Sequence, residues 1–351
     1  MTTTTPLDER IIGSVTGALE LYSIHLGRRL GLYETLEQPR TSDELATTTD
    51  INNRYSREWL EQQAVAGFIT VDDPELAWDD RRYSLTKDQQ AVFAIPDDVS
   101  HVSPLADMIV GIGQVLSNVG DAFRTGKGVP YQDYGPHFRN GMAGANRPAF
   151  THELTSTWLE ALPDVTARLS HGGSIADLGC GAGWSTIALA RAFPDASIVG
   201  IDADPASITD ARANAAKAGI DVQFELADAA TLTEGGPYDL VLILEALHDM
   251  AAPTEVLRQA HRSLRDGGAV LVADEKVAER FIAPGDEMER FVYGFSVVHC
   301  LPATLAEEGS AAIGTAIRPD LVETMAFEAG FNSVELSDID AGFFNLYALR
   351  P

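Results

Sequence analysis

The sequence predicts an α/β protein with two parts: a mainly helical first part and a second part built on an open, largely parallel β-sheet. Three observations support this prediction. In the second part, short apolar runs typical of strands buried on both faces alternate with stretches of helical periodicity. A turn with three glycines, at residues 179–183, follows the first of these runs. Aspartates lie at or near the ends of three successive runs, the edge at which open α/β sheets bind ligands.

The size and composition of the chain limit its possible functions. Its 351 residues are enough for two domains. The formal net charge of −27 argues against nucleic acid and anionic membranes as partners, because neutralising phosphates needs clustered lysine and arginine. The sequence shows no signal-peptide pattern and no apolar run long enough to span a membrane. Two cysteines, Cys180 and Cys300, form no disulfide framework, so we expect a cytoplasmic protein.

The first part has the pattern of a winged helix. Residues 8–36 form an unusually apolar helical stretch, which we expect to be buried against a second copy of the chain. Thr41 or Ser42 is a suitable cap for the next helix. A further helix over 55–66 and a short hairpin within 68–86 complete the pattern.

A winged helix suggests DNA binding, so the charge of this region matters. Residues 41–100 contain five basic and thirteen acidic side chains. The expected recognition helix carries Glu58 and Glu61, which would repel phosphates. We therefore disfavour DNA as a partner.

Between the two parts we expect two helices and a loop. Apolar residues at helical spacing predict a helix over 103–123, and a second helix over 150–162 joins the two parts. The intervening loop, residues 126–135, is rich in glycine and contains Tyr131 and Tyr134.

The glycine-rich turn connects a strand over 174–178 to a helix over 184–193. Between them lie three glycines at alternate positions, Gly179, Gly181 and Gly183. Glycine permits positive φ and lets a ligand approach the backbone closely. Asp177 lies inside the strand, where a carboxylate suits a ligand that carries a positively charged amino group.

Two further aspartates follow the next two strands. Asp202 ends the strand over 197–202, where a carboxylate can accept both hydroxyls of a ribose. Asp228 comes just after the strand over 222–226 and is placed to accept from an adenine amino group. Each of these acids could instead be a helix cap or a turn residue, but all three in one pattern indicate a nucleoside ligand.

This pattern strongly resembles the class I S-adenosylmethionine (SAM)-dependent methyltransferases, over residues 174–351. The resemblance implies a Rossmann-like seven-stranded sheet with an antiparallel last strand, and SAM as the cofactor. The cofactor site that it implies consists of Asp177, Gly179, Gly181, Gly183, Asp202, Ala203, Asp228, Ala229 and Glu245. Plant and polyketide O-methyltransferases of this class carry a similar winged-helix domain, used for dimerisation and to wall the substrate pocket. We therefore expect a dimerisation domain at 1–100, a helical linker and pocket region at 101–170, and a catalytic domain at 171–351.

The fourth strand, over 237–244, leads into the catalytic candidates. His248 and Asp249 follow it, near the edge of the sheet where ligands bind. A phenol titrates near 10 and histidine near 6.5, so a neutral imidazole can take the acceptor's proton as the methyl group arrives. Plant-type O-methyltransferases are similar in having a histidine base oriented by two glutamates. Asp274 or Glu275, after the fifth strand, could supply one of these, and the second cannot be located in the sequence.

A lid insertion is expected at about 276–318, and it resembles an insertion in uncharacterised actinobacterial two-domain methyltransferases. Its apolar, aromatic helix runs through 291–302 and usually would pack as core. The residues expected to bind the substrate are Tyr131, Tyr134, Tyr293 and His299. His299 could instead be a satisfied core histidine. His299 and Cys300 lack the spacing of a zinc site, so we expect no metal.

The sequence therefore predicts a homodimeric SAM-dependent methyltransferase that acts on the oxygen of a small, largely apolar or aromatic acceptor. His248, Asp249 and Glu275 are its catalytic candidates. Alternatives remain: His248 could only shape the pocket, and methyl transfer to nitrogen or carbon could proceed by alignment alone. The chain could also be a SAM-binding regulator with little turnover. A nicotinamide oxidoreductase is disfavoured, because the glycine spacing is shorter than that of the dinucleotide fingerprint.

Overall fold

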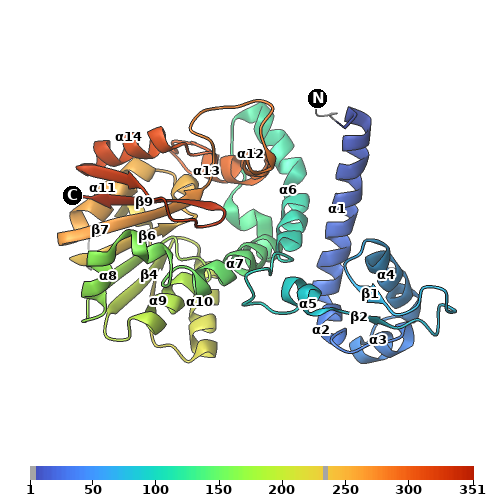
Figure 1. The fold of residues 1–351 in the computed structure, drawn as a ribbon. Helices are drawn as coiled ribbons and strands as arrows, with labels where there is room; N and C mark the ends of the chain where they lie inside the picture. The colour runs from blue at the N-terminus through green and yellow to red at the C-terminus, as the bar shows by residue number, and fades with distance from the viewer. Residues whose placement is uncertain (1–4, 232–235) are drawn as a thin grey trace. The chain divides into compact units, whose positions relative to one another are not determined.

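The computed structural model describes residues 5–231 and 236–351, and the chain forms two compact units. Unit 1 consists of Met1–Gly113 and Pro136–Pro148, and unit 2 of Gln114–Gly135 and Ala149–Pro351. The region predicted as a linker, residues 101–170, is therefore shared between both units. Figure 1 shows the helices and strands of each unit.

Unit 1 contains the predicted winged helix. Its elements are α1 (Leu7–Arg29), α2 (Leu32–Thr35), α3 (Ser42–Thr49), α4 (Asn53–Val65), β1 (Thr70–Val71), β2 (Tyr83–Ser84) and α5 (Lys87–Phe93). β1 and β2 pair antiparallel. Thr41 caps α3 with a capping box: its side chain accepts from the Glu44 N–H, and the Glu44 carboxylate accepts from the Thr41 N–H.

The stretch 8–36, expected as one helix, is divided into α1 and α2. Gly31 lies between them with φ of +66°, a conformation that glycine adopts without strain and that ends a right-handed helix. Tyr33 of α2 packs into the core of unit 1, where its ring stacks on Phe93 and meets Trp59 edge-on. α2 is thus a core element.

The N-terminal helix α1 carries a row of large apolar side chains that are exposed in the single chain. The exposed residues are Leu7, Ile11, Ile12, Val15, Leu19, Tyr22 and Leu26. Its C-terminal end is fixed to α6 by polar contacts: Asp107 accepts from His25 Nδ1 at 2.6 Å and from Arg28 Nε at 3.1 Å. Only one end of α1 is therefore tied to the rest of unit 1 by these contacts.

Two long helices, α6 (Leu105–Thr125) and α7 (Gly135–His152), each contribute residues to both units. Their close approach within unit 1 requires Gly111, because a Cβ there would lie 2.7 Å from the backbone nitrogen of Phe138. Between the helices, the predicted loop contains a short 3-10 helix, η1 (Tyr131–Tyr134).

The expected helix over 150–162 is wrong. α7 ends at His152, and the chain continues through the 3-10 helix η2 (Trp158–Ala161) into α8 (Pro163–Leu169). Residues 155–157 are threonine and serine, whose hydroxyls compete with helical hydrogen bonds; Ser156 Oγ donates to the His152 carbonyl at 2.5 Å. Pro163 has no N–H to continue a helix and begins the next one instead.

Unit 2 contains the seven-stranded sheet, in the order β5-β4-β3-β6-β7-β9-β8. The strands are β3 (Ser174–Leu178), β4 (Ser197–Asp202), β5 (Gln223–Leu226), β6 (Tyr238–Leu244), β7 (Leu264–Glu275), β8 (Ser333–Leu336) and β9 (Phe344–Arg350). β3 to β7 are parallel, and β9 runs antiparallel to both β7 and β8. The predicted Rossmann-like sheet with an antiparallel last strand is confirmed.

Helices cover both faces of this sheet (Figure 1). The helices are α9 (Trp184–Ala192), α10 (Pro205–Ala218), α11 (Pro253–Ser263) and α14 (Pro319–Ala329), together with α8. Alternate residues of β6 face the two cores: Leu242 packs with residues of α8 and α9, and Ile243 packs with residues of α11 and α14. This explains why β6 is apolar from Leu240 to Leu244. No helix of the described ranges is long and apolar enough to cross a bilayer.

The predicted lid insertion, residues 276–318, is helical in its middle, over 287–305. α12 (Glu287–Phe295) continues into the π-helical turn η5 (Ser296–Cys300) and then α13 (Leu301–Leu305). α13 contacts the 3-10 turn η4 (Leu247–Asp249), which follows β6. The 126–130 loop packs on the lid as well: Val129 N–H donates to the Pro302 carbonyl at 2.9 Å.

Candidate active site

The glycine turn after β3 has one glycine that faces open space. All three glycines have positive φ, between +52° and +80°. A Cβ on Gly179 would lie 2.7 Å from Ala246, and one on Gly183 would lie 2.8 Å from the Phe224 ring, so both are required by packing. A Cβ on Gly181 would meet nothing within 4 Å. Gly181 is therefore the glycine at which a ligand can approach the backbone.

Asp177 is held by the first turn of α9. Its Oδ2 accepts hydrogen bonds from Ser185 Oγ at 2.6 Å and Thr186 Oγ1 at 2.5 Å. The side chain is only 1% exposed, and burial raises its pKa to about 6, against the lowering effect of the two hydroxyls. The sequence analysis did not assign Ser185 and Thr186 to the site. They could have been recognised as two adjacent hydroxyl residues in the first turn of the helix that follows the glycines.

Asp202 connects β4 to the glycine turn. Its Oδ2 accepts from the Gly181 N–H at 2.8 Å, and its Oδ1 accepts from the Asp204 N–H at 2.8 Å. Burial raises the pKa of Asp202. A carboxylate oxygen has two acceptor positions, so each oxygen keeps one for a ribose hydroxyl. The residues thus fit the nucleoside part of SAM, beside the open face of Gly181.

The remaining cofactor candidates also follow strand ends of the same sheet. Ala203 follows β4, and Asp228, which is exposed, follows β5 and accepts from the Ala230 N–H at 2.9 Å. Ala229 begins the short 3-10 helix η3 (Ala229–Thr231). Glu245 follows β6 with φ of +51°, a strained conformation that turns the chain toward η4.

His248 lies on η4 with carboxylates on both sides of its ring. Its Nδ1 lies 2.8 Å from Asp274 Oδ1 and 3.2 Å from Glu275 Oε2, and its Nε2 lies 3.4 Å from Asp249 Oδ1. A carboxylate only accepts, so Nδ1 donates to Asp274. β6 and β7 are neighbours, which is why residues after one strand meet the end of the other. The structure therefore brings both Asp274 and Glu275, the last two residues of β7, to the histidine, whereas the sequence suggested only one of them.

The carboxylates control the ionisation of this cluster. Burial alone would lower the pKa of His248, but Glu275, Asp274 and Asp249 outweigh it and raise the pKa well above its usual range. Burial, with the charge of Asp274, raises the pKa of Glu275. The nearby histidine outweighs burial at Asp274 and lowers its pKa. The carboxylates thus stabilise the protonated form of His248, and the histidine stabilises the ionised form of Asp274.

Two tyrosines predicted to bind the substrate meet the lid. The rings of Tyr131 and Tyr134 contact His299 edge-on, with centroid distances of 5.9 Å and 4.6 Å. Tyr134 Oη donates to the Val298 carbonyl at 2.9 Å. Burial lowers the pKa of His299 to about 4, so its ring is neutral. Tyr293, the fourth candidate, makes different contacts: its hydroxyl lies 3.3 Å from Arg318 Nη2, and its ring meets Phe281 edge-on.

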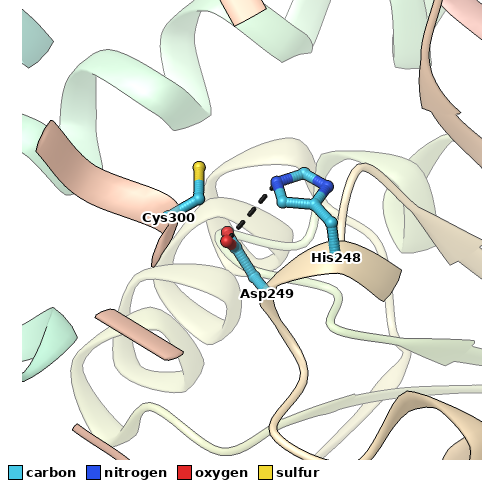
Figure 2. A group of neighbouring side chains, drawn as sticks. All are labelled: His248, Asp249 and Cys300. Carbon is cyan, nitrogen blue, oxygen red and sulfur yellow. Dashed lines mark ion pairs between the residues drawn. The ribbon is translucent and has the colours of Figure 1, made fainter. Parts of the chain in front are cut away.

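Cys300 is a further member of the site that sequence reasoning did not assign to it. The thiol of Cys300 lies close to His248 and Asp249, as Figure 2 shows. Each of the three side chains offers one nitrogen, oxygen or sulfur atom that could bind a metal, and these atoms lie within 4.8 Å of one another. The sequence hints at this role only through the position of Cys300 directly after His299. The contact between Cys300 and η4 depends on how the lid folds, which the sequence does not reveal.

Comparison with known proteins agrees with this fold. A methyltransferase domain matches residues 169–318, and an Rv2258c-like winged HTH domain matches residues 17–94. The chain is 30% identical to 27-O-demethylrifamycin SV methyltransferase of Amycolatopsis mediterranei over 212 residues, 55% of this chain and 78% of that protein. It is 36% identical to the ubiquinone biosynthesis O-methyltransferase of Caulobacter vibrioides over 113 residues, 31% of this chain and only 44% of that enzyme.

A solved structure extends the likeness to the whole chain. Human N-acetylserotonin methyltransferase in complex with SAM superposes with a TM-score of 0.70 at 17% identity, covering 100% of this chain and 99% of that one. The fold, with its winged helix and seven-stranded sheet, is that of the two-domain class I methyltransferases. The chain belongs to the SAM-dependent methyltransferase family.

Proposed function

We propose that the protein transfers a methyl group from SAM to an oxygen atom of a small, largely apolar or aromatic acceptor, with His248 as the general base. The main support for this proposal is the position of His248. It lies just after the carboxyl end of β6, and its Nδ1 donates a hydrogen bond to Asp274. A histidine oriented through Nδ1 has the lone pair of Nε2 for the acceptor's proton.

The carboxylates around His248 suit it to this task. SAM, when bound, supplies an already activated methyl group, so the residues of the chain need only align the acceptor and remove its proton. Asp274, Glu275 and Asp249 stabilise the imidazolium that forms when Nε2 takes that proton. They also make the imidazole a stronger base, closer to a phenol's pKa of about 10. In this role Asp249 and Glu275 act with the base, as the sequence predicts.

The acceptor is proposed to lie against Tyr131, Tyr134 and His299, with Tyr293 further along the lid. The position of His299 supports this placement. His299 directly precedes Cys300, and the Cys300 Sγ lies within 4.8 Å of donor atoms of His248 and Asp249. Aromatic rings and a neutral imidazole favour an apolar or aromatic acceptor over a charged one.

Homodimerisation through the N-terminal helix is part of the proposal. Single apolar residues on a surface are ordinary in a monomer, but the row of exposed apolar side chains on α1 forms a larger patch, which is typical of an interface.

DNA is disfavoured as a partner of the winged helix because the arginines of the winged helix are already paired with carboxylates. Arg57 and Arg81 lie 3.1 Å and 3.2 Å from Glu61, and Arg82 lies 2.9 Å from Glu44. We further propose a cytoplasmic location, consistent with free, buried Cys180 and Cys300.

The test is release of S-adenosylhomocysteine from SAM with a panel of phenols, hydroxyl compounds and amines. Replacing the base in His248→Gln should lower turnover by about 10²- to 10⁴-fold while SAM affinity, measured by calorimetry, barely changes. His171→Gln, an exposed histidine of the same unit, is the matched control and should keep full activity. Near-normal turnover in His248→Gln would mean that the ring only shapes the pocket. Turnover with amines alone would favour methyl transfer to nitrogen. DNA retention without turnover would favour a SAM-binding regulator.

A further inference from the structure

We propose that His248 Nε2, Asp249 Oδ1 and Cys300 Sγ form a binding site for a zinc-type divalent cation (Figure 2). The site goes beyond the proposed methyl transfer, and the two uses of His248 exclude one another. A nitrogen that coordinates a cation has no lone pair for the acceptor's proton, so metal binding switches the enzyme off.

The three donor atoms converge from two different elements. His248 and Asp249 are neighbours on η4, and Cys300 ends the π-helical turn η5 of the lid. Their donor atoms all lie within 4.8 Å of one another, and Nε2 is 3.4 Å from Oδ1. Donors around a tetrahedral zinc, with bonds of about 2.0–2.3 Å, are roughly 3.3–3.6 Å apart. The histidine–aspartate pair already has this spacing, and the thiol, which lies within 4.8 Å of both, must approach by at most about 1.2 Å.

Two of these side chains are buried, and the Cys300 thiol lies 3.4 Å from His299 Nδ1, a contact that metal binding would replace. His248 is 2% exposed and Cys300 is 5% exposed. Within the described part of the chain, the buried Asp249 Oδ1 accepts no hydrogen bond. A buried carboxylate oxygen without a donor is costly, and a cation would satisfy it.

The other side of the imidazole has the arrangement common to metal-bound histidines. Nδ1 donates to Asp274 Oδ1 at 2.8 Å, which fixes the ring and leaves Nε2 as the donor to a metal. Glu275 Oε2 lies 3.2 Å from the same Nδ1. The histidine is thus pre-oriented before any ion arrives.

The donor set decides which ion fits. One nitrogen, one oxygen and one sulfur suit zinc and its chemical relatives, whereas magnesium and calcium prefer oxygen ligands alone. Three protein ligands leave a fourth tetrahedral position for water. On binding, the Cys300 thiol releases its proton to solvent and coordinates as the thiolate.

The experiment titrates the purified, full-length protein with Co²⁺ as a spectroscopic substitute for zinc. We expect a thiolate-to-metal charge-transfer band and tetrahedral d–d bands, both displaced by Zn²⁺. Cys300→Ser should lose the charge-transfer band and bind at least about 100-fold more weakly, since even changes beyond the ligands cost 10- to 100-fold. Cys180→Ser, which replaces the other buried cysteine, should bind like the wild type. Far-ultraviolet circular dichroism checks that each variant is folded.

Turnover gives a separate readout. Zn²⁺ should inhibit the wild-type enzyme, whereas the turnover of Cys300→Ser, relative to its own metal-free rate, should resist inhibition. The absence of a charge-transfer band in the wild type, or an unchanged band in folded Cys300→Ser, would overturn the site. Because the spectra need no acceptor, they stand whether or not methyl transfer to oxygen is found.

Discussion

Replacing the buried aspartate of β3, in Asp177→Asn, should make the SAM-free protein more stable at neutral pH. Burial raises the pKa of Asp177 from 3.8 to about 6. A carboxyl group with a raised folded-state pKa holds its proton more tightly in the folded chain than in the unfolded chain. The free energy of unfolding therefore falls as the pH rises from about 4 to about 6, and the loss is complete above that range.

The size of the effect follows from the same shift. One pKa unit corresponds to about 1.4 kcal/mol, so the ionised Asp177 costs the folded state about 3 kcal/mol at pH 7. Asparagine carries no charge to desolvate, and its amide oxygen can still accept from Ser185 and Thr186. We expect the Tm of unit 2 to rise by roughly 6–12 °C at neutral pH, and the difference to vanish near pH 4.

The assay is thermal unfolding of SAM-free wild type and variant between pH 4 and pH 7.5. Asp195→Asn, an exposed aspartate after α9, is the matched control and should melt like the wild type throughout. An Asp177→Asn protein that melts at or below the wild-type temperature at neutral pH would refute the reasoning. The same variant should bind SAM more weakly, because it lacks the negative charge proposed to attract the cofactor's amino group. The ionised Asp177 would then lower the stability of the folded protein and contribute to SAM binding instead.

Two further predictions concern the cofactor and the assembly. Asp202→Ala should weaken SAM binding by about 10²- to 10⁴-fold in calorimetry, because it loses two hydrogen bonds to a charged acceptor that contribute about 1.5–3 kcal/mol each; unchanged affinity would contradict the ribose assignment. Val15→Glu combined with Leu19→Glu, both exposed on α1, should convert a dimer to a monomer in sedimentation, whereas Val65→Glu on α4 should not. Wild-type protein that sediments as a monomer at micromolar concentration would disprove the dimer.

The division between sequence and tertiary structure is clear in unit 2. The strand over 174–178 and the three glycines after it were predictable, because an apolar run and the positive φ of glycine are properties of neighbouring residues. The antiparallel end of the sheet came from the resemblance to a family. The single helix expected over 150–162 failed because apolar spacing alone does not reveal hydroxyl side chains that bind the backbone, as Ser156 does.

What only the tertiary structure decided is the environment of His248. Its place after the fourth strand is visible in the sequence, but the choice between Asp274 and Glu275 depended on the register of β6 against β7, which brings both to Nδ1. The approach of Cys300 depended on the lid folding back onto η4. Contacts between residues that are 26 or more positions apart leave no periodic signal in the chain. The sequence thus predicted the cofactor edge, and the packing of distant segments determined which side chains lie beside His248.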